Sequence, residues 1–296
     1  MNSVYRLCVF LLLGLMLFAC GEQETISIVN YYDYDYEFPL HDSVTVLEKT
    51  ETYTMYHIRY TSFHDAVVTG LLTIPKNFEK PLPAVIFVHG VKDNKAADYM
   101  VYGHQFLIEA GYAVLRIDVA NHGERNLHPH AYDFVKGYRF WTRDIIAQTV
   151  FDLRRAVDFL EKWEEDIDKT RIGYMGISLG GIIGTVFCGV EQRIKVPVIA
   201  LAGGGLNLMF KLDALDSETL NYVSIIDPLN YVAMISPRPL LMLNAENDEI
   251  ILPLTTKLLY EKAGEPKKII WYPTTHRRVP QNQVFPEAVI WFDAHL

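Results

Sequence analysis

The most informative stretch of this chain is Gly176-Ile177-Ser178-Leu179-Gly180. A strand-like run at 171–175 precedes it, and an apolar run at 181–187, typical of a buried helix, follows it. A strand that turns sharply into a helix brings neighbouring backbones too close for a β-carbon, which explains Gly176 and Gly180. The turn exposes the hydroxyl of Ser178, and the helix N-terminus behind it directs N–H groups at developing negative charge. The pattern predicts that Ser178 is a catalytic nucleophile rather than part of a structural turn.

A serine hydroxyl needs a general base before it can act as a nucleophile. After a nucleophile on a strand–turn–helix of this kind, the acid follows along the chain and the histidine comes last. His276 and His295 are the two histidines after Ser178. His295 is the next-to-last residue, where chains usually fray, whereas His276 lies in a turn after the strand-like run 269–272. We therefore expect His276 to be the base.

The acid that orients this base should follow the preceding strand. The apolar run 240–243 leads into a loop with three carboxylates, Glu246, Asp248 and Glu249. We expect Asp248 to be the acid, with Glu246 as the second candidate. The alternative for Glu246 and Glu249 is that each is a solvated loop charge.

The second donor of an oxyanion hole should come from a loop after an early strand. The run Phe87-Val88-His89-Gly90-Val91 fits this position, and Gly90 would let the backbone turn close to the substrate. The amides of Val91 and Leu179 are the expected donors. We expect His89 to be a structural histidine, buried beside this loop, rather than a catalytic one.

Strand patterns of two kinds occur along the chain. Short runs that are apolar on both faces are typical of parallel strands covered by helices, whereas alternating runs are typical of half-buried antiparallel strands. The apolar runs lie at 84–88, 113–115, 198–202 and 240–243, and the alternating runs at 43–49, 53–60 and 67–74.

Helical patterns separate these strands. One is expected over 99–110, ended by Gly111, and another over 140–163. The alternation predicts an α/β fold, with a mostly parallel central sheet, helices on both faces and a site at the carboxyl ends of the strands. We expect residues 203–236 to form a small cap-like insertion before the acid-bearing strand, although an ordinary connecting helix is the alternative. Its apolar residues would shape an acyl or alcohol pocket; they are Leu206, Leu208, Met209, Phe210 and Leu212.

The amino terminus has the layout of a signal peptide. Arg6 precedes an uncharged run over 7–19 that is too short to span a bilayer comfortably. The run ends Leu17-Phe18-Ala19-Cys20, which resembles the lipobox of bacterial lipoproteins. The resemblance implies cleavage of residues 1–19 and lipid attachment to Cys20, and hence an exported protein anchored in the bacterial cell envelope, on its periplasmic or outer face. An ordinary cleaved leader is the alternative.

Residues 20–42 are polar, acidic and rich in tyrosine, and we expect a tether that packs partly on the body. One catalytic domain is expected over residues 43–296. Of the three cysteines, only Cys188 lies in this domain, within an apolar run, where it is expected to be a small buried hydrophobe.

The formal net charge of −9 argues against nucleic acid as a partner, because a phosphate backbone needs a surface rich in lysine and arginine. No cofactor or metal is expected, since His128-Pro129-His130 lacks ligand spacing with a nearby cysteine or carboxylate pair. The segment from Asp118 to Arg125 follows a strand, and it either lines the pocket or forms a loop held by ion pairs.

Five stretches, in this order, carry a resemblance: 70–75, Val88-His89-Gly90, 118–125, the turn at Ser178, and 236–242. Together they resemble α/β-hydrolases of the dienelactone-hydrolase and acetyl-xylan-esterase-like branch, which is related to the catalytic domain of prolyl oligopeptidases. The resemblance covers roughly residues 45 to 296 and implies the α/β-hydrolase fold. It also implies a serine hydrolase that cleaves carboxylic esters through a Ser-His-Asp triad and an acyl-enzyme.

Two other functions stay open at this point. One is a serine peptidase of the prolyl-oligopeptidase type, and the other is a non-catalytic surface lipoprotein that keeps the fold for binding. The expected partner is a small-molecule ester, and membrane contact is expected through the lipid anchor only. The sequence does not indicate the oligomeric state.

Overall fold

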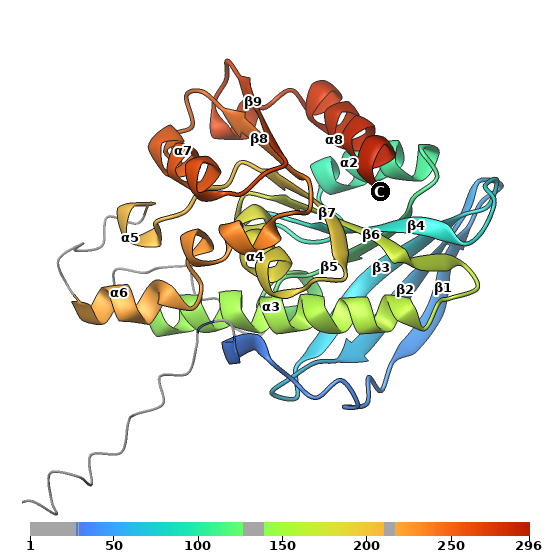
Figure 1. Cartoon of the computed structure of the whole chain (residues 1–296). Helices are drawn as coiled ribbons and strands as arrows, with labels where there is room; N and C mark the ends of the chain where they lie inside the picture. The colour runs from blue at the N-terminus through green and yellow to red at the C-terminus, as the bar shows by residue number, and fades with distance from the viewer. Residues whose placement is uncertain (1–27, 29, 127–138, 210–216) are drawn as a thin grey trace, which may run out of the picture. The chain divides into compact units, whose positions relative to one another are not determined.

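The computed structural model describes residue 28 and residues 30–126, 139–209 and 217–296 (Figure 1). The chain divides into two compact units, residues 1–33 and 34–296. In the first unit, the described part is a short 3₁₀ helix, η1 (Asn30–Tyr32). The predicted signal peptide and Cys20 lie outside the described residues, as do His128, His130, Phe210 and Leu212.

The second unit is built on a nine-stranded mixed sheet with the strand order β1-β2-β3-β5-β4-β6-β7-β8-β9. The first three strands and β5 pair antiparallel, and all pairs from β5 to β9 are parallel. The carboxyl ends of β4, β6, β8 and β9 therefore lie along one edge of the sheet. The strands are β1 (Ser43–Lys49), β2 (Tyr53–Thr61), β3 (Val67–Pro75), β4 (Leu82–Val88), β5 (Ala113–Ile117), β6 (Ile167–Ile177), β7 (Ile194–Ala200), β8 (Leu240–Ala245) and β9 (Lys267–Tyr272).

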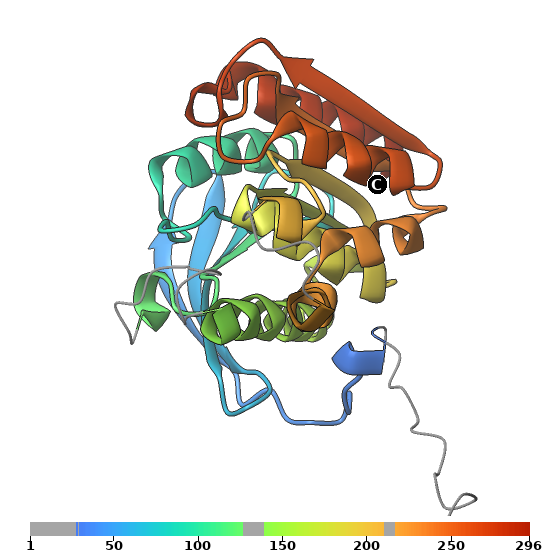
Figure 2. The ribbon, with the colours of Figure 1, turned by 90° about the vertical axis from the view of Figure 1, so that its left-hand side faces the viewer.

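Helices cover both faces of this sheet, as the sequence predicts. Helices α2 and α8 pack together on one face, and α3 and α4 pack together on the other (Figures 1 and 2). No helix in the described part of the chain is long and apolar enough to cross a membrane. The helices are α2 (Asp98–Glu109), α3 (Arg139–Glu161), α4 (Leu179–Val190), α5 (Leu206–Met209), α6 (Ser217–Ser224), α7 (Pro253–Lys262) and α8 (Gln281–His295), and the 3₁₀ helices of this unit are η2 (Gly123–Arg125), η3 (Pro228–Asn230), η4 (Val232–Ile235) and η5 (His276–Arg278).

The apolar core explains why the inner strands are continuously hydrophobic. Strands β4 to β8 present buried side chains to helices α2 and α8, and these helices contribute Leu107, Phe285 and Phe292. The chain leaves α2 through Gly111, which has a φ of +90° and so occupies the left-handed conformation expected of a helix end. The strand members of this cluster include Val85, Phe87, Val114, Met175, Val198, Leu241 and Leu243.

Burial of strands β1 and β3 differs from the sequence expectation. Every residue of β1 is exposed, so the half-buried character predicted for residues 43–49 is wrong. The reason is that β1 is the outermost strand of the sheet. In β3, every residue after Val67 is buried, because this strand lies between β2 and β5 and contacts α2.

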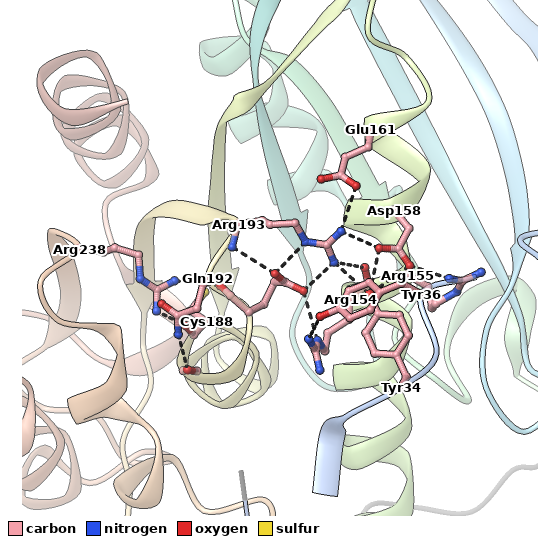
Figure 3. Close-up of polar contacts among 12 residues, drawn as sticks. Tyr34, Tyr36, Arg154, Arg155, Asp158, Glu161, Cys188, Gln192, Arg193 and Arg238 are labelled. Carbon is pink, nitrogen blue, oxygen red and sulfur yellow. Dashed lines mark hydrogen bonds and ion pairs between the residues drawn. The ribbon is translucent and has the colours of Figure 1, made fainter. Parts of the chain in front are cut away.

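The stretch that leads into β1 is fastened to helix α3 by its tyrosines (Figure 3). The hydroxyl of Tyr34 donates a hydrogen bond to Asp158 at 2.9 Å and accepts one from Arg193 at 3.0 Å. Arg193 also pairs with Asp158 at 2.7 Å, and Arg154 donates to the hydroxyl of Tyr36 at 2.8 Å. The hydroxyls of Tyr34 and Tyr36 therefore fasten this stretch to α3 and to Arg193 within the second unit.

Candidate active site

Ser178 lies at the sharp turn between β6 and α4, with a φ of 56° and a ψ of −114°. This conformation is strained for a residue with a β-carbon. A β-carbon on Gly176 would lie 2.3 Å from the carbonyl oxygen of Gly180, and one on Gly180 would lie 2.4 Å from that of Val88. Both positions therefore accept only glycine unless the backbone moves.

The structure brings Ser178, His276 and Asp248 together. The distance from His276 Nδ1 to Asp248 Oδ2 is 2.7 Å, and that from His276 Nε2 to Ser178 Oγ is 3.0 Å. A carboxylate can only accept, so Nδ1 carries the proton and donates it to Asp248. Nε2 is then the acceptor and faces the serine hydroxyl, which is the arrangement that a general base requires.

Of the three carboxylates in the acid loop, Asp248 is the buried one, with 5% of its surface exposed. Its Oδ1 accepts hydrogen bonds from the backbone amides of Ile250 and Ile251, at 2.9 and 2.7 Å. Glu246 is exposed. The carboxylate of Glu249 accepts a hydrogen bond from the backbone amide of His276 at 3.1 Å, a role that its exposed loop position did not signal.

The two predicted oxyanion donors come from different elements. Leu179 is the first residue of α4, and Val91 follows β4 and lines the cavity at Ser178. Gly90 approaches the nucleophile closely, since a β-carbon there would lie 3.4 Å from Ser178 Cβ. Neither the Val91 nor the Leu179 amide donates a hydrogen bond to another described residue, and their role as oxyanion donors stays a prediction.

Residues 24–201 match the family model of acetyl xylan esterases (AXE1). The chain belongs to this family of hydrolases. Its Bacillus subtilis relative YuxL, described as an uncharacterized peptidase, is 26% identical over 269 residues, which cover 81% of this chain and 39% of that protein. The chain spans 64% of a second Bacillus subtilis relative, YtaP, also at 26% identity.

Solved structures share the fold of this chain. An acetyl xylan esterase from Paenibacillus sp. R4 has a TM-score of 0.74 at 21% identity, over 87% of this chain and 90% of that one. Acetyl xylan esterase 1 from Thermoanaerobacterium sp. JW/SL YS485 has a TM-score of 0.73 at 18% identity, over 90% and 92% of the two chains. The fold is therefore the predicted α/β-hydrolase fold.

The cavity at Ser178 in this member of the family has a volume of about 250 Å³. Its wall combines apolar side chains, most of them buried, with a few polar ones at the surface. The polar wall includes the exposed side chains of Arg277 and Gln281. None of the described residues in 203–236 lines this cavity. The apolar wall includes Ile177, Ala200, Leu201, Leu243, Ile250, Val284 and Phe285.

Tyr99 was not identified from the sequence, yet its side chain reaches the same cavity. Its hydroxyl accepts a hydrogen bond from the backbone amide of Gly90 at 2.8 Å and donates one to Asp93 at 3.1 Å. Burial raises the pKa of Tyr99 above its usual value, so the phenol stays protonated. Tyr99 therefore holds the loop that carries Val91, with Asp93 fixing the direction of the hydroxyl.

His89 is the structural histidine that the sequence predicts. It is fully buried, its Nδ1 donates to the carbonyl of Gly90 at 2.7 Å, and its Nε2 accepts from the amide of Val119 at 3.1 Å. Both ring nitrogens are thus used by the neutral imidazole. Burial lowers the pKa of His89 to about 4, since the charged form would lose its water and meet the Val119 donor.

Because the pKa of His89 is lowered in the folded state, the folded protein should lose stability in acid. The pKa of His89 is about 4 when folded and 6.5 in the reference state, so between these values the unfolded chain binds more protons. The free energy of unfolding should therefore fall as the pH drops from 6.5 to 4, and this loss is complete below the folded pKa. His89→Asn should reduce the slope of stability against pH by up to about 1.4 kcal/mol per pH unit. Urea unfolding between pH 7 and 4 measures the slope; an unchanged slope in the variant would contradict this assignment.

The loop after β5 is held by ion pairs and does not line the cavity at Ser178. Asp118 is fully buried, pairs with Lys95 and accepts the backbone amide of Glu124 at 3.1 Å. Lys95 also pairs with Glu124 at 2.6 Å, and Arg125 pairs with Asp152 at 2.7 Å. This confirms the ion-paired alternative for the segment.

Proposed function

We propose that this member of the acetyl xylan esterase family hydrolyses carboxylic esters through an acyl-enzyme on Ser178. The observation that carries the proposal is the continuous relay from Asp248 through His276 to the strained Ser178. A buried carboxylate, a histidine with a defined tautomer and a serine hydroxyl at the cavity wall, in this order, form the constellation that performs acyl transfer on many folds. The match of residues 24–201 to the acetyl xylan esterase family supports ester chemistry.

In this mechanism, His276 Nε2 takes the proton of the Ser178 hydroxyl as the oxygen attacks the ester carbonyl. Asp248 keeps Nδ1 protonated and stabilises the imidazolium that forms. The amides of Val91 and Leu179 donate to the oxyanion, assisted by the N-terminus of α4. His276 then gives the proton to the leaving alcohol, and water attacks the acyl-enzyme with His276 again as the base.

The size of the cavity supports a substrate with a short acyl chain. About 250 Å³ accommodates a small acyl group among the buried apolar side chains. The exposed Arg277 and Gln281 then lie where a polar alcohol would make hydrogen bonds. The proposed substrate class is therefore a short-chain ester, above all an acetate, of a polar alcohol.

A panel of substrates tests this function. Purified protein should hydrolyse acetyl and butyryl esters with a larger kcat/KM than octanoyl or feruloyl esters, and all these activities should be absent from Ser178→Ala prepared in parallel. Equal rates of hydrolysis by the wild-type protein and by Ser178→Ala would refute the proposed mechanism. A preference for octanoyl esters would keep the mechanism and refute the short-chain proposal.

A second candidate function is cleavage of a peptide bond, because the relative YuxL is described as a peptidase. The same relay can attack an amide, so the bond must be distinguished by assay. Two acetyl substrates that differ only in an ester or an amide linkage to the same leaving group distinguish the two activities. Turnover of peptide amides at a kcat/KM equal to or above that of the esters would favour this candidate.

Tyr99→Phe tests how the oxyanion loop is positioned. The change removes the acceptor of the Gly90 amide and leaves the aromatic ring in place. We expect kcat for an acetyl ester to fall by up to about tenfold, which corresponds to one hydrogen bond, while KM changes little. The control is Tyr102→Phe on the same helix, where wild-type kcat is expected. A Tyr99→Phe enzyme with full kcat would show that this bond has no role in catalysis.

We also propose that the mature protein is anchored by lipid at Cys20. The support is the sequence Leu17-Phe18-Ala19-Cys20 after an uncharged run. Protein expressed in a bacterial host should partition into the detergent phase of Triton X-114, and Cys20→Ser should move it to the aqueous phase. Mass spectrometry of the mature N-terminus would contradict the proposal if it found an unmodified Cys20.

A further inference from the structure

A second cavity, of about 690 Å³, lies apart from the cavity at Ser178. It is bounded by strands β1, β2, β3 and β5 and by helix α2, and none of the described residues that line it also lines the cavity at Ser178. Its walls carry apolar side chains from three of these elements, namely Met55, Leu71 and Ile108. A cavity with apolar walls and a few convergent polar groups is the usual form of a small-molecule site.

Arg116 supplies a buried positive charge to this cavity. Only 2% of its surface is exposed. Its Nη1 donates to the backbone carbonyl of Lys95 at 3.0 Å, but its Nε has no partner, and no described carboxylate forms an ion pair with it. Burial lowers the pKa of Arg116 to about 10, which leaves it charged at neutral pH. A buried charge without an opposite charge is strongly unfavourable. Binding of an anion beside the guanidinium of Arg116 would therefore be favourable.

His104 supplies a second unsatisfied group to the same cavity. It is 4% exposed, and its Nε2 has no hydrogen-bond partner among the described residues. Burial lowers the pKa of His104 to about 3, with the nearby charge of Arg116 as a further cause. The ring is therefore neutral at neutral pH and can offer one N–H to an acceptor.

We propose that this cavity binds a small monocarboxylate with an apolar body, its carboxylate accepting hydrogen bonds from Arg116 and His104. The carboxylate supplies the missing negative charge, and planar carboxylates match the guanidinium fork. The apolar body lies against the walls of the cavity. Two exposed carboxylates, Glu48 and Glu109, also line the cavity, and Glu48 accepts a hydrogen bond from Tyr53 at 2.9 Å. Solvent screens these two charges, but they disfavour a second negative charge on the ligand.

Titration of the whole chain with hexanoate tests the proposal, with hexanamide and hexylamine as matched neutral and cationic probes. Histidine-labelled protein reports the location by NMR. Hexanoate should shift the His104 resonances and raise the pKa of that ring, and hexanamide and hexylamine should bind at least about tenfold more weakly. Shifts confined to His276, or equal binding of the three probes, would overturn the proposal.

Two variants make this test specific. Arg116→Met removes the charge and should weaken hexanoate binding at this site at least about tenfold. Val101→Trp places a large side chain at an exposed wall of the cavity, leaves Arg116 intact and should also block binding. The second variant decides the matter if the first does not fold, and unchanged hexanoate binding in Val101→Trp would refute the site. These readouts do not depend on esterase activity.

Discussion

Ser178→Ala should lower kcat for an acetyl ester by on the order of 10⁶-fold, with the fold intact. The hydroxyl is the atom that forms the acyl-enzyme, and in triad enzymes its loss removes nearly all catalysis by the relay. The methyl side chain of alanine fits where the serine side chain lies, so His276 and Asp248 should keep their places. Stopped assays at high enzyme concentration, with circular dichroism as the check on folding, measure the effect.

Ser178→Ala should keep a measurable residual activity. The Val91 and Leu179 amides and the binding cavity are unchanged in Ser178→Ala. A rate on the order of 10³-fold above uncatalysed hydrolysis is therefore expected to remain, as in other triad enzymes. A reduction of less than about tenfold would show that another nucleophile performs the reaction.

Asp248→Asn should lower kcat by on the order of 10⁴-fold. The amide that replaces the carboxylate can present its NH₂ group to His276, and this favours the tautomer with the proton on Nε2. That nitrogen then cannot accept the proton of Ser178. The backbone hydrogen bonds to Ile250 and Ile251 can persist through the remaining oxygen, so the loop should keep its conformation. Kinetics with an acetyl ester measures the loss.

Glu249→Gln is the matched control for this change, one residue further along the same loop. The amide oxygen of glutamine can still accept the His276 backbone amide, and the side chain is exposed. We expect kcat to stay within about threefold of the wild-type value. If Glu249→Gln and Asp248→Asn lost activity equally, the assignment of the acid to Asp248 would be wrong.

Local patterns were sufficient to predict a mostly parallel sheet with helices on both faces, but not the strand order or the helices α7 and α8. The continuously apolar runs became the strands β4, β5, β7 and β8, because helices cover the sheet on both faces. Gly111 ended α2 as its left-handed conformation suggests. The exposure of β1 could not be predicted in this way, since alternation of side chains describes the strand itself and not whether anything packs on it.

The triad candidates were also accessible to sequence reasoning, because each follows a recognisable strand. Tyr99 and Glu249 were not. Tyr99 acts through a hydrogen bond to the backbone of Gly90, nine residues earlier, which exists only because the start of α2 folds back against the loop after β4. Glu249 holds the backbone of His276, whose place beside it depends on the pairing of β8 with β9. Contacts of this kind depend on the tertiary fold and leave no local signal.

The nucleophile is the centre of this account, and covalent labelling tests it most directly. A fluorophosphonate probe reacts with a serine only when a base activates the hydroxyl. After incubation with the native protein and digestion, mass spectrometry should find one modified residue, Ser178, and no modification in urea-unfolded protein or in His276→Gln. Native protein that is not labelled, or is labelled at another serine, would contradict the account.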